Sequence, residues 1–304
     1  MPLHLNTPLY RSLQLSNHKQ HVWLKMEALQ PPGSFKIRGI GSACAAYAAQ
    51  GATRFVAASG GNAGIAVAYA GTALSIPVLV VVPETTSDAA IRLLSLNGAE
   101  VIVFGASFQE ANDFAQSMLS GTDAFLHPFD DPYLWGGHAT MIDEVHASGV
   151  KPDAVVLSVG GGGLLSGVAE GLRRNHWHDI SIVAVETEGA ASLRAAITTG
   201  RVTQLEKITS VASSLAAKRV CEQALRVCKE RTVISAVVSD KSALAACEFF
   251  LRDHRVLVEP ACGASLSLAY ESAPELESFK NILVIVCGGA TATLDQIRKW
   301  ASNI

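Results

Sequence analysis

Short, strongly apolar segments that alternate with longer helical segments are the feature that most limits how this chain can fold. The apolar segments, rich in Val, Ile and Leu, are the expected strands at 21–27, 54–58, 78–82, 100–104, 154–159, 181–186 and 281–287. Helical periodicity is found between them, at 36–50, 62–74, 89–97, 108–119, 164–174, 242–254 and 262–270. Strands that are apolar on both faces indicate sheets covered by helices, and regular alternation with helices indicates parallel pairing. The sequence therefore predicts an α/β fold with two open, mostly parallel twisted sheets flanked by helices.

Composition narrows the class of protein further. A hydrophobic share of 49% and a charged share of 17% exclude a disordered chain, and 304 residues suggest about two domains. The net charge of −3, without a stripe of Lys and Arg, makes a nucleic-acid partner unexpected. The longest apolar runs, such as 77–83 and 282–287, are far too short to span a membrane. Six cysteines without a Cys-x-x-Cys pair, and an N-terminus unlike a signal peptide, predict a cytoplasmic protein with reduced thiols.

Two glycine-rich turns follow predicted strands at positions where α/β sheets bind ligands. Ser59-Gly60-Gly61-Asn62-Ala63-Gly64 opens a helix, where free N–H groups would attract a carboxylate. Its glycines are equally consistent with a tight turn that has no ligand. Gly160-Gly161-Gly162-Gly163 also precedes a helix, and backbone N–H groups there would hold a phosphate. Because Gly161-x-Gly163-x-x-Ser166 and Glu186 match part of a dinucleotide fingerprint, a nicotinamide-dependent dehydrogenase is one alternative.

Two reactive side chains lie beside further turns. Lys36 falls in the first turn of a predicted helix, with Ser34 as the expected N-cap. The helix dipole disfavours a cation there and lowers the pKa of the amine toward the neutral form that a nucleophile or base needs. Taken alone, however, a lysine at such a place is more often an ordinary solvated side chain. Cys287 ends an apolar strand just before Gly288-Gly289. It is either a small buried hydrophobe or a thiol that faces the same ligand site.

Together these motifs resemble those of pyridoxal-phosphate (PLP) enzymes of fold type II, the tryptophan-synthase-β type. The resemblance is greatest to the mammalian-type serine/threonine dehydratase branch and extends from Thr7-Pro8-Leu9 to about Leu294. The segments that carry it are Ser34-Phe35-Lys36-Ile37-Arg38-Gly39, Ser59 to Gly64, Gly160 to Gly163, Val258-Glu259-Pro260-Ala261-Cys262-Gly263-Ala264 and Cys287-Gly288-Gly289. The resemblance implies a small domain at 40–130, inserted into a large PLP-binding domain made of 1–39 and 131–304. The active site would lie in the cleft between the two.

The resemblance also implies a role for each site residue. Lys36 would hold PLP as a Schiff base, Phe35 would pack against its ring and Cys287 would lie beside the pyridine nitrogen. Asn62 would bind the ring hydroxyl. Gly160, Gly161, Gly162 and Gly163 would bind the phosphate, and Ser59, Gly60 and Asn62 would receive the substrate carboxylate. A monovalent cation, K+, would be held by Glu186 and by the carbonyl groups of Ala190, Gly160, Leu215 and Ala217.

The implied activity is that of an ammonia-lyase that acts on L-serine, with L-threonine as a second substrate, in a homodimer. It would eliminate the β-hydroxyl and release pyruvate or 2-oxobutanoate with ammonia. A serine racemase and a β-replacement enzyme of the cysteine-synthase kind are alternatives within the fold, and a non-catalytic amino-acid-binding module is another. The chain departs from many relatives in the segment Ala290-Thr291-Ala292-Thr293, where they carry an asparagine, and it has Gly60 at a position where near relatives vary among small residues.

Overall fold

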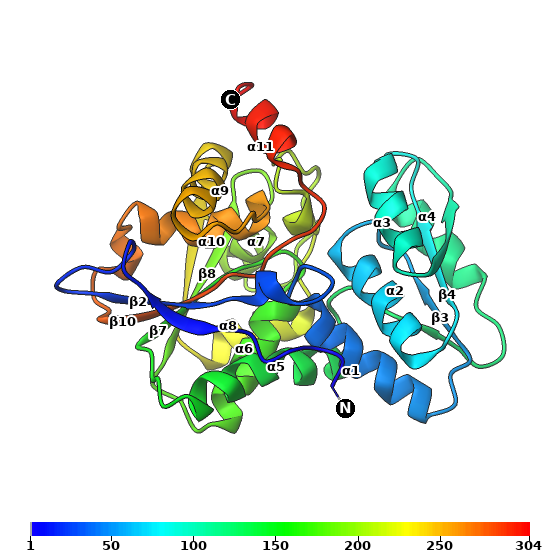
Figure 1. Ribbon diagram of the computed structural model, residues 1–304, viewed down its shortest axis with the longest axis horizontal. Helices are drawn as coiled ribbons and strands as arrows, with labels where there is room; N and C mark the ends of the chain where they lie inside the picture. The colour runs from blue at the N-terminus through cyan, green and yellow to red at the C-terminus, as the bar shows by residue number, and fades with distance from the viewer. Residues whose placement is uncertain (1) are drawn as a thin grey trace.

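Two β-sheets organise the computed structural model, which describes residues 2–304 (Figure 1). The strands are β1 (Leu9–Ser12), β2 (His21–Lys25), β3 (Arg54–Ala57), β4 (Val78–Val82), β5 (Ala99–Val103), β6 (Asp123–Phe125), β7 (Ala154–Ser158), β8 (Ser181–Thr187), β9 (Val233–Val238) and β10 (Asn281–Ile285). The helices are α1 (Lys36–Ala49), α2 (Asn62–Leu74), α3 (Asp88–Leu96), α4 (Phe108–Ser117), α5 (Pro132–Ala147), α6 (Gly163–Arg174), α7 (Ser192–Thr199), α8 (Glu222–Glu230), α9 (Asp240–His254), α10 (Pro260–Tyr270) and α11 (Leu294–Ala301).

The larger sheet joins the two ends of the chain. Its strand order is β1-β2-β10-β7-β8-β9, and every neighbouring pair is parallel except β1 with β2. β10, from the C-terminal part, therefore lies between β2, from the N-terminal part, and β7. This order brings the segments that follow β2, β7 and β10 to one edge of the sheet, because the carboxyl ends of parallel strands point the same way.

The smaller sheet, β5-β4-β3-β6, is entirely parallel and forms the lobe that carries α2, α3 and α4 (Figure 1). Alternate residues of its two central strands enter different clusters: Phe55 and Val80 lie in one, and Val56 and Val81 in the other. Both faces are therefore covered, as the unbroken apolar runs predict. The sheet falls inside the range 40–130 expected for the small domain, and those domain boundaries remain a prediction.

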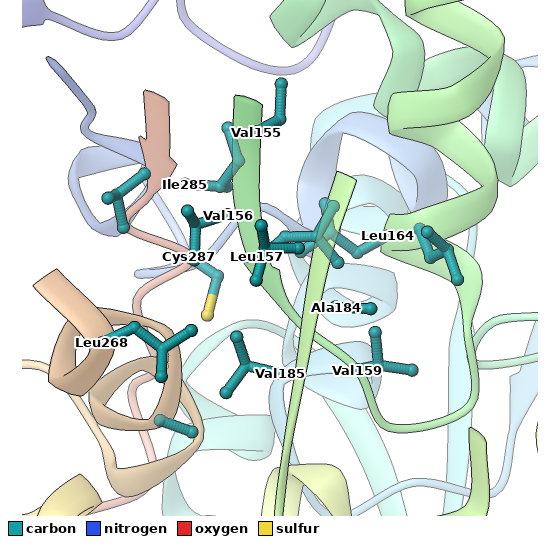
Figure 2. Packing of buried hydrophobic residues seen from close by; sticks show 14 of the residues in the cluster. Val155, Val156, Leu157, Val159, Leu164, Ala184, Val185, Leu268, Ile285 and Cys287 are labelled. Carbon is teal, nitrogen blue, oxygen red and sulfur yellow. The ribbon is translucent and has the colours of Figure 1, made fainter. Parts of the chain in front are cut away.

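The core of the large sheet is a continuous apolar cluster built from β7, β8, β10 and the helices against them (Figure 2). Val155, Leu157, Val185 and Ile285 are inaccessible to solvent, and Cys287 belongs to the same cluster at 6% exposure. The thiol thus lies at the margin between the core and the segment that follows β10.

Helices α1 and α5 approach each other closely enough that glycine is required on both. A Cβ on Gly39 of α1 would lie 2.5 Å from the His138 ring, and a Cβ on Gly137 of α5 would overlap the Arg38 carbonyl oxygen. Because α1 begins at Lys36, this contact fixes the helix that carries the predicted catalytic lysine.

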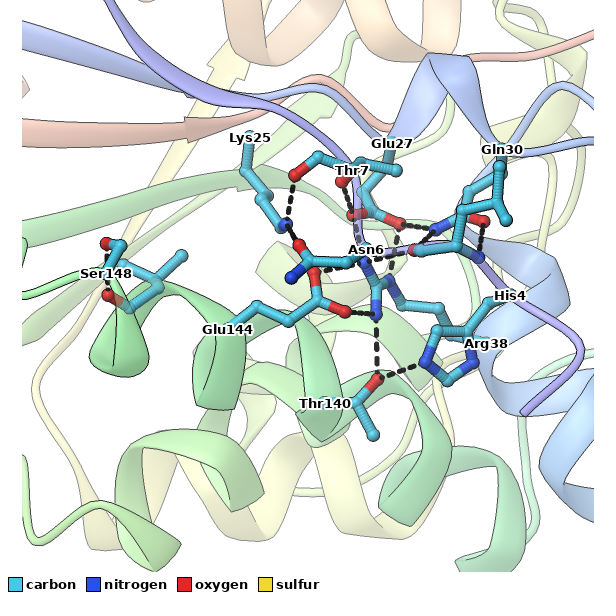
Figure 3. A network of polar contacts seen from close by, with 12 residues as sticks. His4, Asn6, Thr7, Lys25, Glu27, Gln30, Arg38, Thr140, Glu144 and Ser148 are labelled. Atoms are coloured by element: carbon cyan, nitrogen blue, oxygen red, sulfur yellow. Dashed lines mark hydrogen bonds and ion pairs between the residues drawn. The ribbon is translucent and has the colours of Figure 1, made fainter. Parts of the chain in front are cut away.

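A buried polar network also fixes α1 against its neighbours (Figure 3). Arg38 is completely buried and donates to both carboxylate oxygens of Glu27, at 2.7 and 2.8 Å. It also donates to both oxygens of Glu144, at 2.7 Å each. Lys25 pairs with Glu144 and donates to the Thr7 carbonyl at 2.7 Å. Two cations and two carboxylates therefore join β2, α1 and α5.

The predicted α/β fold class with two mostly parallel sheets is confirmed. The seven expected strands and seven expected helices all occur, with ends that differ by at most two residues. β1, β6, β9, α5, α7 and α11 were not expected from the sequence. None of the helices in residues 2–304 is both long and apolar enough to cross a membrane.

Candidate active site

The predicted lysine motif and the Cys287 segment lie side by side, although about 250 residues separate them in the chain. The Phe35 N–H donates to the Cys287 carbonyl at 3.1 Å, and the Gly289 N–H donates to the Gly33 carbonyl at 2.9 Å. Ser34 forms an antiparallel bridge with Gly288. This short ladder extends the large sheet into the turn before α1 and holds Lys36 beside the end of β10.

Lys36 is the first residue of α1, and its Nζ donates to the Pro128 carbonyl at 2.6 Å. Burial lowers the pKa of this amine to about 8, whereas the negative charge of Glu259 acts in the opposite direction. The expected Ser34 N-cap is wrong. Phe35 is the residue before the helix, and its phenyl ring has no oxygen with which to cap it, whereas Ser34 lies one residue earlier and pairs with Gly288. Within residues 2–304 the buried Ser34 hydroxyl has no hydrogen-bond partner.

The low pKa of Lys36 predicts unusual reactivity in the ligand-free protein. An amine reacts in its neutral form, so labelling of Lys36 by a small aldehyde followed by reduction should increase through a midpoint near pH 8. The reference is an exposed lysine, for which an amine ordinarily has its midpoint at about pH 10.4. Mass spectrometry of the labelled peptides measures both profiles at once. Equal midpoints for the two lysines would contradict the buried, easily deprotonated amine.

Phe35 is backed by a histidine that the sequence did not single out. The ring of His138, on α5, lies 4.9 Å from that of Phe35 between centroids. Burial lowers the pKa of His138 well below its usual value, so its ring is neutral, and neither nitrogen has a hydrogen-bond partner in the described chain. The residue therefore serves as an aromatic support that restricts the position of Phe35.

The tetraglycine segment lies between β7 and α6, at the carboxyl end of a central strand. The N–H groups of Gly160, Gly161 and Gly162 donate to no acceptor among residues 2–304. Gly162 has a φ of +92°, a conformation that side chains rarely adopt, and a Cβ on Gly161 would overlap the Phe129 ring. Since Phe129 follows the carbonyl that receives the Lys36 amine, the structure brings this loop and the lysine together. Its three free donors at a helix start form a site suited to an anion.

Asn62, the first residue of α2, makes hydrogen bonds across the molecule. Its Nδ2 donates to Glu259 at 2.7 Å and to the Ser214 hydroxyl at 3.2 Å, and its Oδ1 accepts from the Ala290 N–H at 2.9 Å. Glu259 lies in the segment from Val258 to Ala264, which contributes to the resemblance but for which no role is predicted. Only the fold reveals its place in the site, because its partners come from distant parts of the chain.

Ser59 and Gly60 lie in the turn between β3 and α2. The Gly61 N–H is 3.4 Å from the Ser59 hydroxyl, and α2 begins without a side-chain cap. A Cβ on Gly60 would lie 2.7 Å from the Thr86 methyl group, so the glycine allows Thr86 to approach the turn. An uncapped helix start beside small residues can accept a carboxylate.

Cys287 lies two residues beyond β10 and is held as a neutral thiol. The neighbouring Cys262 thiol and burial raise the pKa of Cys287 far above its usual value. A neutral thiol donates or accepts only weak hydrogen bonds and carries no charge into the site.

Glu186 lies within β8 and is completely buried. Its two oxygens accept from the Leu193 and Arg194 N–H groups, at 2.7 and 2.8 Å, and burial raises its pKa to about 7. A carboxylate used in this way is not presented to a ribose, which counts against the dinucleotide alternative.

The other residues of the predicted cation site come from nearby turns. Ala190 precedes α7, and the Leu215 carbonyl accepts from the Ala217 N–H at 2.7 Å. A Cβ on Gly160 would lie 3.1 Å from the Leu215 Cα, so these two segments are in contact. No group of three or more His, Cys, Asp or Glu side chains in residues 2–304 is arranged to hold a metal. A cation at this place would therefore depend on backbone carbonyls.

Comparison with known proteins shows which family this chain is similar to. Residues 1–288 match a family model described as pyridoxal-phosphate dependent enzyme. The chain is 45% identical to human L-serine dehydratase/L-threonine deaminase, over 98% of this chain and 94% of the relative. It superimposes on a fungal L-serine ammonia-lyase from Rhizomucor miehei with a TM-score of 0.93 and 32% identity, over 99% of both chains. Maize serine racemase gives a TM-score of 0.90 at 24% identity, over 99% of this chain and 93% of the racemase, a likeness of fold alone.

Proposed function

Because the chain belongs to the pyridoxal-phosphate dependent enzyme family, we propose that it is a PLP-dependent L-serine ammonia-lyase that also accepts L-threonine. The observation that carries this proposal is the 45% identity, over nearly the whole of both chains, to human L-serine dehydratase/L-threonine deaminase. The products would be ammonia with pyruvate from serine, or with 2-oxobutanoate from threonine.

The residues of this chain fit the cofactor. Three free N–H groups at the start of α6 suit a phosphate, and the half-buried Lys36 has its amine near them with its pKa lowered to about 8. The hydroxyl of Ser34, next to Phe35, is a buried polar group without a partner in the part of the chain described. PLP, when bound, supplies the electron sink for elimination.

The protein would then supply position and proton transfer. Lys36 would attach the cofactor and, when free, its neutral amine would take the α-proton of the substrate. Gly160 to Gly163 would bind the phosphate and Phe35 would pack on the ring. The turn at Ser59 and Gly60 and the start of α2 would bind the substrate carboxylate. Asn62 would donate to the ring oxygen.

Cys287 would lie beside the ring nitrogen. A thiol whose pKa is raised stays neutral and does not hold a proton on that nitrogen as a carboxylate would. Less charge is then drawn into the ring, which would favour loss of the β-hydroxyl over transamination.

A direct assay tests the proposed reaction. The purified protein supplied with PLP should be yellow, and L-serine should change its visible spectrum while pyruvate accumulates. L-threonine should give 2-oxobutanoate. Formation of D-serine without pyruvate would indicate the racemase alternative, and turnover that requires an added thiol nucleophile would indicate β-replacement. A colourless protein after addition of PLP would contradict all three.

We further propose a K+ site at Glu186 with the carbonyl groups of Ala190, Gly160, Leu215 and Ala217. Two buried oxygens support it. Among residues 2–304 the Glu186 carboxyl accepts from backbone N–H groups but from no cationic side chain, and the hydroxyl of Ser192 lacks a hydrogen-bond partner. Because burial raises the Glu186 pKa to about 7, the ionised form costs free energy that a bound cation would offset.

The pH dependence of K+ binding follows from that pKa. Glu186 gains its negative charge as pH rises through about 7, so K+ should stabilise the protein more at pH 8 than at pH 6. At a K+ concentration about 100 times its Kd, the expected stabilisation is about 3 kcal/mol. Thermal unfolding in K+ and in a bulky organic cation measures it, and the Glu186→Gln variant should lose the difference. An identical Tm in both salts at pH 8 would contradict the site.

The six free cysteines support a reducing compartment, and we propose a cytoplasmic enzyme. We also propose a homodimer, which light scattering of the purified protein would test by its mass.

A further inference from the structure

Glu259 occupies the N-cap position of α10 but does not cap that helix. Its side chain is 4% exposed and extends away from the helix. Oε1 accepts from the Asn62 Nδ2 at 2.7 Å, and Oε2 accepts from the Thr291 hydroxyl at 2.8 Å. A buried carboxylate is costly unless it has partners, and here one of the two partners, Asn62, belongs to the candidate site. The local structure of α10 therefore does not account for a glutamate at this position.

The surrounding hydrogen bonds fix which way the Asn62 amide faces. Burial raises the pKa of Glu259, but its hydrogen bonds from Ser214, Thr291 and Asn62 favour the ionised form, which only accepts. The Ala290 N–H only donates. With Nδ2 toward Glu259 and Oδ1 toward Ala290, both contacts are matched. A rotated amide would place its oxygen against the Glu259 carboxylate and its NH2 group against the Ala290 N–H. Both contacts would then be repulsive, so Glu259 and Ala290 together select one orientation.

The Glu259 side chain also explains why the second residue of the Gly288-Gly289 pair is a glycine. Gly289 has a φ of +135°, and a Cβ built on it would overlap the Glu259 carboxyl group. A residue with a side chain at 289 would push the carboxylate away from Asn62. The backbone of this segment is thus shaped around the Glu259 side chain.

We propose that Glu259 is a positioning residue that holds Asn62 as a hydrogen-bond donor toward the ring oxygen of the cofactor. Of the two N–H groups on Nδ2, one makes the short contact with Glu259, at 2.7 Å, and is retained. The other makes the longer contact with Ser214, at 3.2 Å, and is the one given up to a ligand oxygen. The inference rests on the proposed function, which places PLP against Asn62.

Two substitutions of Glu259 distinguish the effect of its side-chain length from the effect of its negative charge. Glu259→Gln retains the length of the side chain and an oxygen for Asn62, while its NH2 group can donate to the Thr291 hydroxyl. Glu259→Asp keeps the charge but is one methylene shorter, so it cannot reach both partners. The affinity of the ligand-free protein for PLP, from a fluorescence titration, is the readout. We expect the Asp variant to bind about tenfold more weakly, a loss of roughly 1.4 kcal/mol, and the Gln variant to lie within about threefold of wild type.

The opposite ranking, with Asp close to wild type and Gln much weaker, would show that charge matters rather than hydrogen-bond geometry and would overturn the proposal. Wild-type affinity in both variants would overturn it as well. Glu271→Asp is the matched control, because the same change is made at the exposed end of the same helix. Circular dichroism and thermal unfolding establish that each variant is folded.

A double-mutant cycle tests whether Glu259 acts through Asn62. In the Asn62→Ala background, Glu259→Asp should cause no further loss of PLP affinity. An equal loss in both backgrounds would show an independent role and contradict the inference. Pyruvate formation by the wild-type protein is measured separately. A wild type that binds PLP without making pyruvate would refute the proposed reaction and leave the Glu259 result interpretable, whereas a wild type that binds no PLP would refute both.

Discussion

Lys36→Ala is expected to produce a folded protein that neither retains PLP covalently nor forms pyruvate from L-serine. Proton transfer by a positioned side chain contributes about 10²–10⁴ to a rate, and this amine would also attach the cofactor, so kcat should fall by at least about 10⁴. Lys25, a buried lysine near the start of the chain, cannot take over its role. The Lys25 amine donates to the Thr7 carbonyl and pairs with Glu144. Pyruvate assays and the visible spectrum measure the loss.

Two control variants test whether the loss of activity is specific to the amine of Lys36. Lys36→Arg keeps a positive charge and a long side chain but has no amine that can be deprotonated, so it should be as inactive as the alanine variant. Lys151→Ala removes an exposed lysine that pairs with Asp179 on the surface, and should keep wild-type kcat and spectrum. Catalysis by Lys36→Ala within tenfold of wild type would refute the assignment of Lys36.

The buried strands were predicted well for a simple physical reason. β4 and β7 are buried along their whole length, so each reads as an unbroken apolar run between turns. β6 has only three residues and begins with Asp123, and β1 is a partly exposed edge strand that includes Arg11. Neither has the composition of a buried strand.

Helix α5 was missed because its sequence argues against a helix. It contains Gly136-Gly137, and glycine in a helix interior costs about 1 kcal/mol relative to alanine. The reason for Gly137 lies on another element, since a Cβ there would overlap the Arg38 carbonyl on α1. Close packing of two helices overrides local propensity here, and a sequence read locally contains no sign of it.

The residues of the candidate site also divide into those that a local sequence pattern predicts and those that only tertiary contacts reveal. Lys36, Asn62 and the tetraglycine segment could be proposed because each has a local signature of a turn beside a strand or a helix start. Glu259 and His138 have no such signature. Their places depend on contacts with Asn62 and Phe35, which are far away in the sequence.

Arg38 is the residue whose removal should destabilise the fold most. It is completely buried and donates to both oxygens of Glu27 and of Glu144. Although burial alone would raise the pKa of Glu144, hydrogen bonds from Arg38 and Lys25 lower it, so this carboxylate is charged at neutral pH. Arg38→Ala would leave the buried Glu27 carboxylate without its cationic partner, and the expected loss is about 3–5 kcal/mol in the free energy of unfolding. The midpoint of urea unfolding, followed by circular dichroism, measures it.

A compensating variant distinguishes lost pairing from lost volume. If unpaired charge is the cause, Arg38→Met with Glu27→Gln should be more stable than Arg38→Met alone, because one buried charge is then removed. If lost packing were the cause, the second substitution would not help.

Because α1 begins at Lys36, two residues before Arg38, the Arg38→Met variant should also hold the active-site lysine less firmly. The pH midpoint for labelling of Lys36 should then shift from about 8 toward that of an exposed amine. Such a shift would link the stability of this network to the chemistry of the site. An unchanged Lys36 midpoint in a destabilised Arg38→Met protein would show that the network supports the fold without tuning the lysine.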